Sequence, residues 1–121
     1  MKSMKIKREL LDALIEVAKE NHPMEFFALL TGRKNVIEEF VYLPFQQGET
    51  FATFDSSLIP LGMRVYGTVH SHPSPSPRPS EQDLATFASF GKVHVIIHYP
   101  YCRNCFKIYD RNGKEIELEI V

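Results

Sequence analysis

The sequence HSHPSPSPRPSEQD, residues 70–83, holds two histidines one residue apart, four prolines at alternate positions and a final aspartate. It follows residues 64–69, a run rich in Val, Tyr and Thr that predicts a β-strand. Residues two apart on a strand point to the same face, ~6.6 Å apart at ~3.3 Å per residue. His70 and His72 therefore present two imidazoles to one side. The stretch predicts either a metal site with a stiff loop or a proline-rich ligand for another protein.

The end of this stretch supplies a candidate third metal ligand. Catalytic zinc sites take three protein ligands and leave one position for water. Asp83 is the candidate because the loop after His72 leads directly into the helix predicted at 80–90. The prolines restrict that loop and lower the entropy lost when the ligands are fixed. By itself, the spacing from Ser80 to Asp83 predicts a capping box at a helix start.

The position of the prolines separates the two interpretations. A docking ligand normally lies in a flexible segment, whereas this segment joins a predicted strand to a predicted helix inside the domain. The combination of two histidines, a serine and an aspartate favours the metal site.

The hydrophobic pattern of the whole chain predicts a mixed α/β domain built around one sheet. Helices are expected at 8–20 and 80–90, and strands at 26–31, 36–43, 64–69, 93–99, 106–109 and 115–121, with a looser strand at 50–55. The polar sequences GRKN and DRNGK predict two hairpins. In the second helix we expect Leu84, Phe87 and Ala88 to face inward. No internal repeat or long linker divides residues 1–121, so we expect a single domain.

Composition restricts the classes of partner. The formal net charge is −1, and the 14 Lys and Arg residues are scattered along the chain. This balance argues against a nucleic-acid or membrane-surface protein and favours protein or small-molecule partners. The N-terminal residues are charged and do not resemble a signal peptide. We therefore expect a soluble, cytoplasmic protein.

Other histidines and the two cysteines are expected to be structural. His94 and His98 are interpreted as solvated or structural residues, and His22 as a helix-end residue whose charge matches the helix dipole. Cys102 and Cys105 are too few for a secreted disulfide framework. The pair could be a redox pair, half of a zinc site shared across a dimer, or a disulfide. We favour a structural disulfide or idle thiols over redox catalysis, because neither cysteine opens a helix after a strand.

Two motifs resemble those of a known family. The spacing His70-x-His72-x7-Ser80-x-x-Asp83 resembles the signature of the JAMM or MPN+ metalloproteases. HPMEFFALLTG, residues 22–32, is similar to that family's second signature, a glutamate that opens a short apolar strand ending near Gly. The resemblance covers most of the chain and is greatest to short, single-domain archaeal members. It implies the MPN/JAMM fold, a single mixed, twisted sheet flanked by helices with a cytidine-deaminase-like architecture.

The resemblance also implies a reaction. His70, His72 and Asp83 would ligate one catalytic Zn²⁺, Glu25 would act as general base and acid, and Ser80 would steady the oxyanion. Zinc lowers the pKa of its water toward ~7, which makes hydroxide available at neutral pH. The substrate would be a lysine-linked conjugate of a ubiquitin-like modifier, cut at the isopeptide bond. The position of Glu25 opposite the zinc rests on the resemblance, since the sequence holds many glutamates.

Alternatives to this isopeptidase remain at the level of sequence. They are processing of the C-terminus of a sulfur-carrier-type ubiquitin-like protein, a metal-free MPN scaffold, and a RadC-like DNA-associated protein, against which the near-neutral charge speaks. A nucleobase deaminase is excluded, because no His-x-Glu precedes the C-x-x-C pair, which stands one residue out of register with Pro100. The number of subunits is open, with a homodimer among the options.

Overall fold

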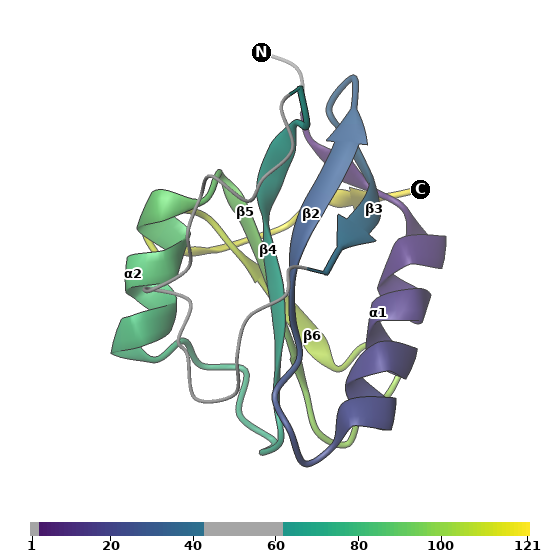
Figure 1. Cartoon of the computed structure of the whole chain (residues 1–121), viewed down its shortest axis with the longest axis vertical. Coiled ribbons are helices and arrows are strands. Elements are labelled where there is room, and N and C mark those ends of the chain that lie inside the picture. Colours follow the sequence, from purple (N-terminus) through teal and green to yellow (C-terminus); the bar gives the residue numbers. More distant parts are fainter. Residues whose placement is uncertain (1–2, 43–61) are drawn as a thin grey trace.

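We describe residues 3–42 and 62–121 of a computed structural model of the chain. The elements are β1 (Lys5–Ile6), α1 (Arg8–Asn21), β2 (Phe27–Arg33), β3 (Val36–Val41), β4 (Val65–His72), α2 (Glu81–Ser89), β5 (Val93–His98), β6 (Phe106–Tyr109), β7 (Glu115–Ile116) and β8 (Glu119–Ile120). The described strands form one mixed sheet in the order β7-β6-β5-β4-β2-β3-β1-β8. Figure 1 shows α1 and α2 on opposite sides of this sheet. The predicted mixed α/β fold is thus confirmed.

The first helix forms where the hydrophobic period predicted it. Leu11, Leu14, Ile15 and Ala18 are all buried and belong to the main core against the sheet. Full burial of a side chain such as Leu contributes about 1.5–3 kcal/mol, so this face fixes α1 far more strongly than its surface ion pairs do. The helix ends at Asn21, and the backbone N–H of the C-cap residue His22 donates to carbonyls of the last turn.

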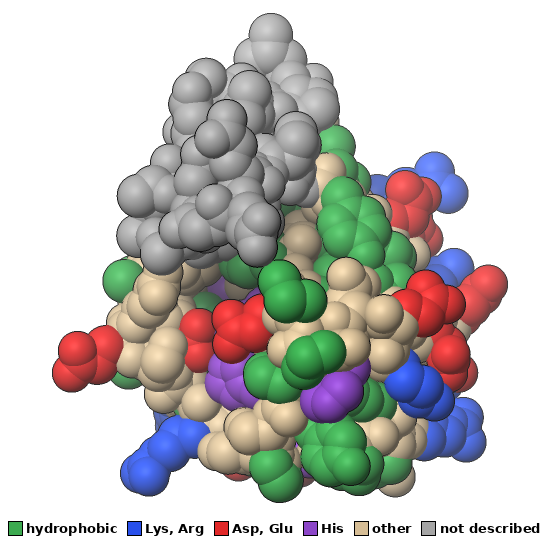
Figure 2. Space-filling view, turned by 60° about the horizontal axis from the view of Figure 1, so that its bottom comes forward, with side chains coloured by type: hydrophobic (Ala, Val, Ile, Leu, Met, Phe, Trp, Pro, Cys, Tyr) green, Lys and Arg blue, Asp and Glu red, His purple; other side chains and the backbone are tan. Residues whose placement is uncertain are grey.

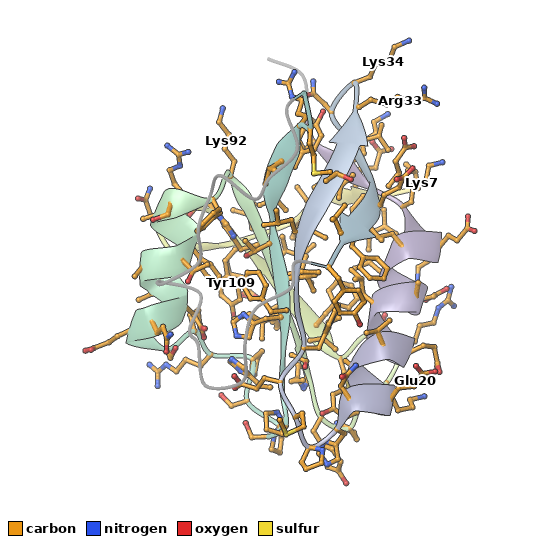
Figure 3. All side chains as sticks on the ribbon, viewed as in Figure 1. Lys7, Glu20, Arg33, Lys34, Lys92 and Tyr109 are labelled. Carbon is orange, nitrogen blue, oxygen red and sulfur yellow. A yellow bond between two sulfur atoms is a disulfide. The ribbon has the colours of Figure 1, made fainter. Side chains whose placement is uncertain are left out.

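The β2–β3 hairpin and the β2–β4 pair form the centre of the sheet. Lys34 and Asn35 turn the hairpin with positive φ angles of 53° and 62°, as two-residue turns of type I′ require. Figure 3 shows Lys34 at the tip of this hairpin. On its other side β2 pairs antiparallel with β4, with Phe27 opposite His70. This register determines which side chains of β2 share a face with the histidines.

The second helix is part of the connection between the parallel strands β4 and β5. Those strands approach so closely at Gly67 that a Cβ there would lie 1.5 Å from the Val93 carbonyl oxygen. Phe87 anchors α2, because its ring stacks on His94 at 4.4 Å and on Tyr109 at 5.9 Å. Figure 3 shows Tyr109 between the sheet and α2.

The inward face expected of the second helix is only partly correct. Phe87 is buried as predicted, but Leu84 is 40% exposed and Ala88 is also exposed. The helix has nine residues and rests on the sheet through Thr86 and Phe87. Only these two adjacent residues of α2 are buried, in place of the expected amphipathic stripe along the helix.

The C-terminal segment differs from the single strand expected at 115–121. Its first part, β7, pairs with β6, whereas β8 pairs in parallel with β1 at the opposite edge of the sheet. The backbone of Val121 donates to the Ile6 carbonyl and accepts from the Arg8 N–H. The prediction missed this because β1 has only two residues and gives no periodic signal. The strand expected at 50–55, and the end of the one expected at 36–43, lie outside the described residues.

Cys102 and Cys105 form a disulfide in the turn between β5 and β6. This confirms the structural pairing that was among the expected states. The His98 N–H donates to the Cys105 carbonyl, so the bridged turn continues the end of β5. In the described parts of the chain, neither helix is long and apolar enough to cross a membrane.

His94 is a structural residue, as expected. Its side chain is fully buried, with Nδ1 2.7 Å from the Thr68 hydroxyl and Nε2 3.0 Å from the Gly91 carbonyl oxygen. A carbonyl only accepts, so Nε2 carries the hydrogen and Nδ1 accepts from Thr68. Burial lowers the pKa of His94 from 6.5 to about 4.

We predict that this neutral histidine makes folding stability depend on pH. The unfolded chain binds the proton near pH 6.5, whereas the folded chain binds it near pH 4, so stability is complete above 6.5 and declines toward 4. The total loss is about 3 kcal/mol, at ~1.4 kcal/mol per pH unit. Urea unfolding of chelator-treated wild type and His94→Phe between pH 6.5 and pH 4 measures this loss of stability. The pH dependence of the free energy of unfolding should correspond to one proton fewer taken up on unfolding in the variant than in wild type. Equal pH dependence in the two proteins would contradict the assignment of a neutral, buried His94.

Candidate metal centre

Three side chains predicted to be metal ligands converge at the end of β4. His70 and His72 lie among the last three residues of that strand, and Asp83 lies in the first turn of α2. The two Nε2 atoms are 2.9 Å apart, and they lie 3.0 and 3.3 Å from the two carboxylate oxygens of Asp83. One ligand atom from each residue lies within 4.8 Å of the others, so the group could hold a metal ion. On the face drawn in Figure 2, histidine side chains reach the surface beside acidic ones.

The proline loop fixes the ring of His72. Its Nδ1 lies 3.0 Å from the Ser76 carbonyl oxygen, so that nitrogen donates and Nε2 faces the other two residues. The loop is held at two points: the N–H of Tyr99, directly after β5, donates to the Ser74 carbonyl, and the hydroxyl of Tyr109 in β6 donates to the Pro77 carbonyl. The prolines therefore lie in a loop that orients the candidate ligand His72.

The capping box orients Asp83. Its backbone N–H donates to the Ser80 hydroxyl oxygen at 3.1 Å, and its carboxylate accepts from the Ser80 N–H at 2.8 Å. The cap and the metal-ligand interpretation of S-x-x-D are therefore compatible, because the second carboxylate oxygen faces His70. The positive end of the helix dipole also favours the ionised form.

The charges at this site oppose the effect of burial. Burial alone would raise the pKa of Asp83, but hydrogen bonds from His70 and His72 hold it well below its usual range. For His72, burial alone would lower the pKa; the hydrogen bonds to Asp83 and Ser76, with the negative charges of Asp83 and Glu25, raise it. The site therefore favours a positive charge between these side chains.

The donor set fits zinc. Two imidazole nitrogens and a carboxylate oxygen are a known ligand set for catalytic Zn²⁺, which leaves one position open. Donors held at about 2.0–2.1 Å in a tetrahedron lie about 3.3 Å apart, close to the 2.9–3.3 Å separations between these atoms. Two ring nitrogens 2.9 Å apart also need a shared cation or proton between them.

Glu25 stands two residues before the start of β2, near His72. Phe27 pairs with His70, and the Ser71 N–H donates to the Phe26 carbonyl at 2.9 Å, so the pairing continues one residue beyond β2. One more residue in this register would set Glu25 opposite His72. Cross-strand partners share a face of a sheet. The charge of Glu25 acts on His72 accordingly and contributes to its raised pKa.

Several contacts of the site were not predicted from sequence. The Phe27 ring stacks on the His70 ring at 6.4 Å and 13°, and Ser71 bonds to the segment that carries Glu25. Both follow from the β2–β4 register, which the sequence does not give. The histidines predicted to be structural lie outside the metal group: Nδ1 of His22 bonds to the Tyr101 hydroxyl at 2.6 Å, and His98 Nδ1 lies 3.0 Å from the Tyr99 carbonyl oxygen.

Comparison with known proteins agrees with this geometry. Residues 7–109 match the family described as prokaryotic homologs of the JAB domain. The chain belongs to this family. A JAB1/MPN domain protein from Archaeoglobus fulgidus has 53% sequence identity and a TM-score of 0.82, with 98% of this chain and 99% of that one covered.

Two further relatives carry names that refer to metal chemistry. A structure described as "JAMM: A Metalloprotease-like Zinc Site in the Proteasome and Signalosome" is 49% identical, covers 99% of both chains and has a TM-score of 0.82. A Haloferax volcanii protein named "Probable metalloprotease" is 32% identical over 127 residues, which are 96% of this chain and 78% of that protein. This JAB domain is thus metalloprotease-like in sequence, fold and donor set.

We predict that the affinity of this JAB domain for Zn²⁺ falls as the pH is lowered from 8 to 5. Protons compete with the metal for the histidines, and the pKa of His72 lies above its usual value. Asp83 stays ionised throughout this range and adds no proton dependence. Competition with a chromophoric chelator measures the affinity at each pH. A His98→Gln control should give the same curve as wild type; an affinity independent of pH would contradict the histidine ligands.

Proposed function

We propose that this JAB domain, residues 1–121, hydrolyses the isopeptide bond between a ubiquitin-like modifier and a substrate lysine in a zinc-dependent reaction. The observation that carries the proposal is the arrangement at one end of the sheet. Three donors suited to zinc converge there, and the charge of a nearby glutamate, Glu25, acts on one of them. A metal site with an adjacent carboxylate is suited to hydrolysis by an activated water.

His70, His72 and Asp83 would hold the ion, each through an atom that already points toward the others. Bound there, zinc would lower the pKa of a water molecule and polarise the scissile carbonyl. The chain's part is to hold these side chains in place: the Ser76 carbonyl fixes the tautomer of His72, and the Ser80 cap fixes the carboxylate of Asp83.

Glu25 would transfer the proton. Glu25 is exposed and its charge acts on His72, so it is accessible to both water and substrate near the metal group. We infer that its carboxylate accepts a proton from the attacking water and passes it to the departing lysine amine. Positioned proton transfer of this kind contributes about 10²–10⁴-fold to a rate.

Ser80 would stabilise the developing oxyanion. In the capping box its oxygen accepts a hydrogen bond from the Asp83 N–H, so its own hydroxyl hydrogen is not used by the cap. Ser80 is exposed next to the metal group. The hydroxyl can therefore donate to a carbonyl oxygen that gains charge, as donors in oxyanion holes do.

The choice of a ubiquitin-like substrate rests on the family. JAMM proteins generally act on conjugates of ubiquitin-like modifiers, and this chain carries the motif residues that resemble theirs, His70, His72, Ser80 and Asp83. An extended diglycine tail suits a site beside a sheet, because its backbone can pair with a strand and its glycines pass close to the ion. The convergent donor set speaks against a metal-free scaffold.

The deciding experiment compares Glu25→Gln, Asp83→Ala and wild type. The substrate is a ubiquitin-like protein ending in Gly-Gly, linked to the Nε atom of a lysine in a second protein. Wild type should release the modifier with an intact Gly-Gly end. Glu25→Gln should lower kcat at least ~10²-fold and keep bound zinc, whereas Asp83→Ala should lose both activity and zinc. Mass spectrometry identifies the products, and metal analysis the zinc content.

Glu20→Gln is the matched control, because Glu20 lies at the exposed end of α1 and points away from the sheet in Figure 3. It should behave as wild type. Undiminished cleavage by Glu25→Gln would overturn the role of Glu25, and intact conjugate after incubation with zinc-loaded wild type would overturn the isopeptidase.

A further inference from the structure

The segment that carries Glu25 is held by the side chain of Ser71, the residue between His70 and His72. We propose that Ser71 is a positioning residue, which fixes the direction in which the chain leaves β2 and so sets Glu25 on the metal side of the sheet. This inference rests on the proposed function for its catalytic consequence, whereas the geometry it describes can be measured separately.

Ser71 and Phe26 are joined by two hydrogen bonds. The Phe26 N–H donates to the Ser71 hydroxyl oxygen at 2.8 Å, and the Ser71 N–H donates to the Phe26 carbonyl at 2.9 Å. Ser71 is fully buried and Phe26 is 2% exposed. Both polar groups of the Phe26 backbone are thus satisfied by one residue, at a place where water does not compete.

Alternation along β4 explains why this residue acts on Glu25 and not on the metal. His70 and His72 point to the face that α2 covers, so Ser71 between them points to the face of α1. Phe26 belongs to the core on that face, together with Val69. With Phe26 held toward α1, the residue before it projects to the opposite face, where the ligands lie.

The two hydrogen bonds between Ser71 and Phe26 lie just outside the regular strand. β2 begins at Phe27, and Glu25 is exposed one residue before the hydrogen-bonded Phe26. Without the hydroxyl, the Phe26 N–H would be buried without this acceptor, a loss that favours rotation of the backbone toward other partners. A shift of about 1 Å in a catalytic group can lower a rate ~10²-fold.

A purely structural role for Ser71 makes a different prediction. Loss of any buried hydroxyl from β4 would then lower stability without a specific effect on Glu25. Thr68 provides the matched control, because it is also fully buried on β4 and its hydroxyl bonds to His94, away from the Glu25 segment. Thr68→Val removes one buried hydrogen bond from the same strand, as Ser71→Ala does.

The test uses the Co²⁺-loaded protein for geometry and the Zn²⁺-loaded protein for activity. NMR would record the pseudocontact shift that Co²⁺ produces at the Glu25 carboxyl carbon, together with hydrogen exchange of the Phe26 amide. In Ser71→Ala we expect Phe26 exchange to accelerate at least about tenfold and the Glu25 shift to change. Thr68→Val should leave both as in wild type. Ser71→Cys, which keeps the side-chain size but has a weak acceptor, provides a second variant should Ser71→Ala not fold.

Kinetics on the lysine-linked modifier conjugate complete the test. We expect Ser71→Ala to lower kcat by about 10- to 100-fold with KM within about twofold of wild type, and to leave zinc affinity unchanged. Wild-type kcat and an unchanged Glu25 shift in both Ser71 variants would overturn the inference, as would equal effects of Thr68→Val. If zinc-loaded wild type cleaves nothing while the Glu25 shift still depends on Ser71, the proposed function fails and the positioning role stands.

Discussion

The antiparallel pairing of Phe27 with His70 is the constraint on which the site depends. Side chains alternate along a strand, so a slip of one residue between β2 and β4 would move every side chain of β2 to the other face. Continued two residues beyond β2, the observed register would set Glu25 opposite His72, whereas a slipped register would bring Met24 or Phe26 there. Neither could transfer a proton. The packing of Phe26 and Leu30 in the core beneath α1 opposes such a slip, because both would have to leave it.

A second constraint joins the strand to α2. Asp83 reaches the histidines across the proline loop, and that loop is tied to the sheet through the carbonyls of Ser74 and Pro77. The capping box then fixes the carboxylate relative to the helix. The helix start and the candidate metal site thus share Ser80 and Asp83, so the bonds that stabilise α2 also orient the candidate ligand Asp83.

The sequence predicted local features well and long-range ones poorly. The spacing of His70, His72, Ser80 and Asp83 is local, and the structure brings the histidines and the aspartate together as expected. The position of Glu25, by contrast, depends on a register between strands more than 40 residues apart in the chain, and its place opposite the metal group rested on resemblance alone. The division of residues 115–121 between two edges of the sheet was missed for the same reason, since its partner β1 is too short to show a pattern.

A crystal structure of the zinc-loaded protein tests the central claim most directly. The account predicts one ion held by Nε2 of His70, Nε2 of His72 and a carboxylate oxygen of Asp83, with the Glu25 carboxylate facing that ion from across the β2–β4 pair. An ion held by a different set of residues, or Glu25 turned to the α1 side of the sheet, would contradict it.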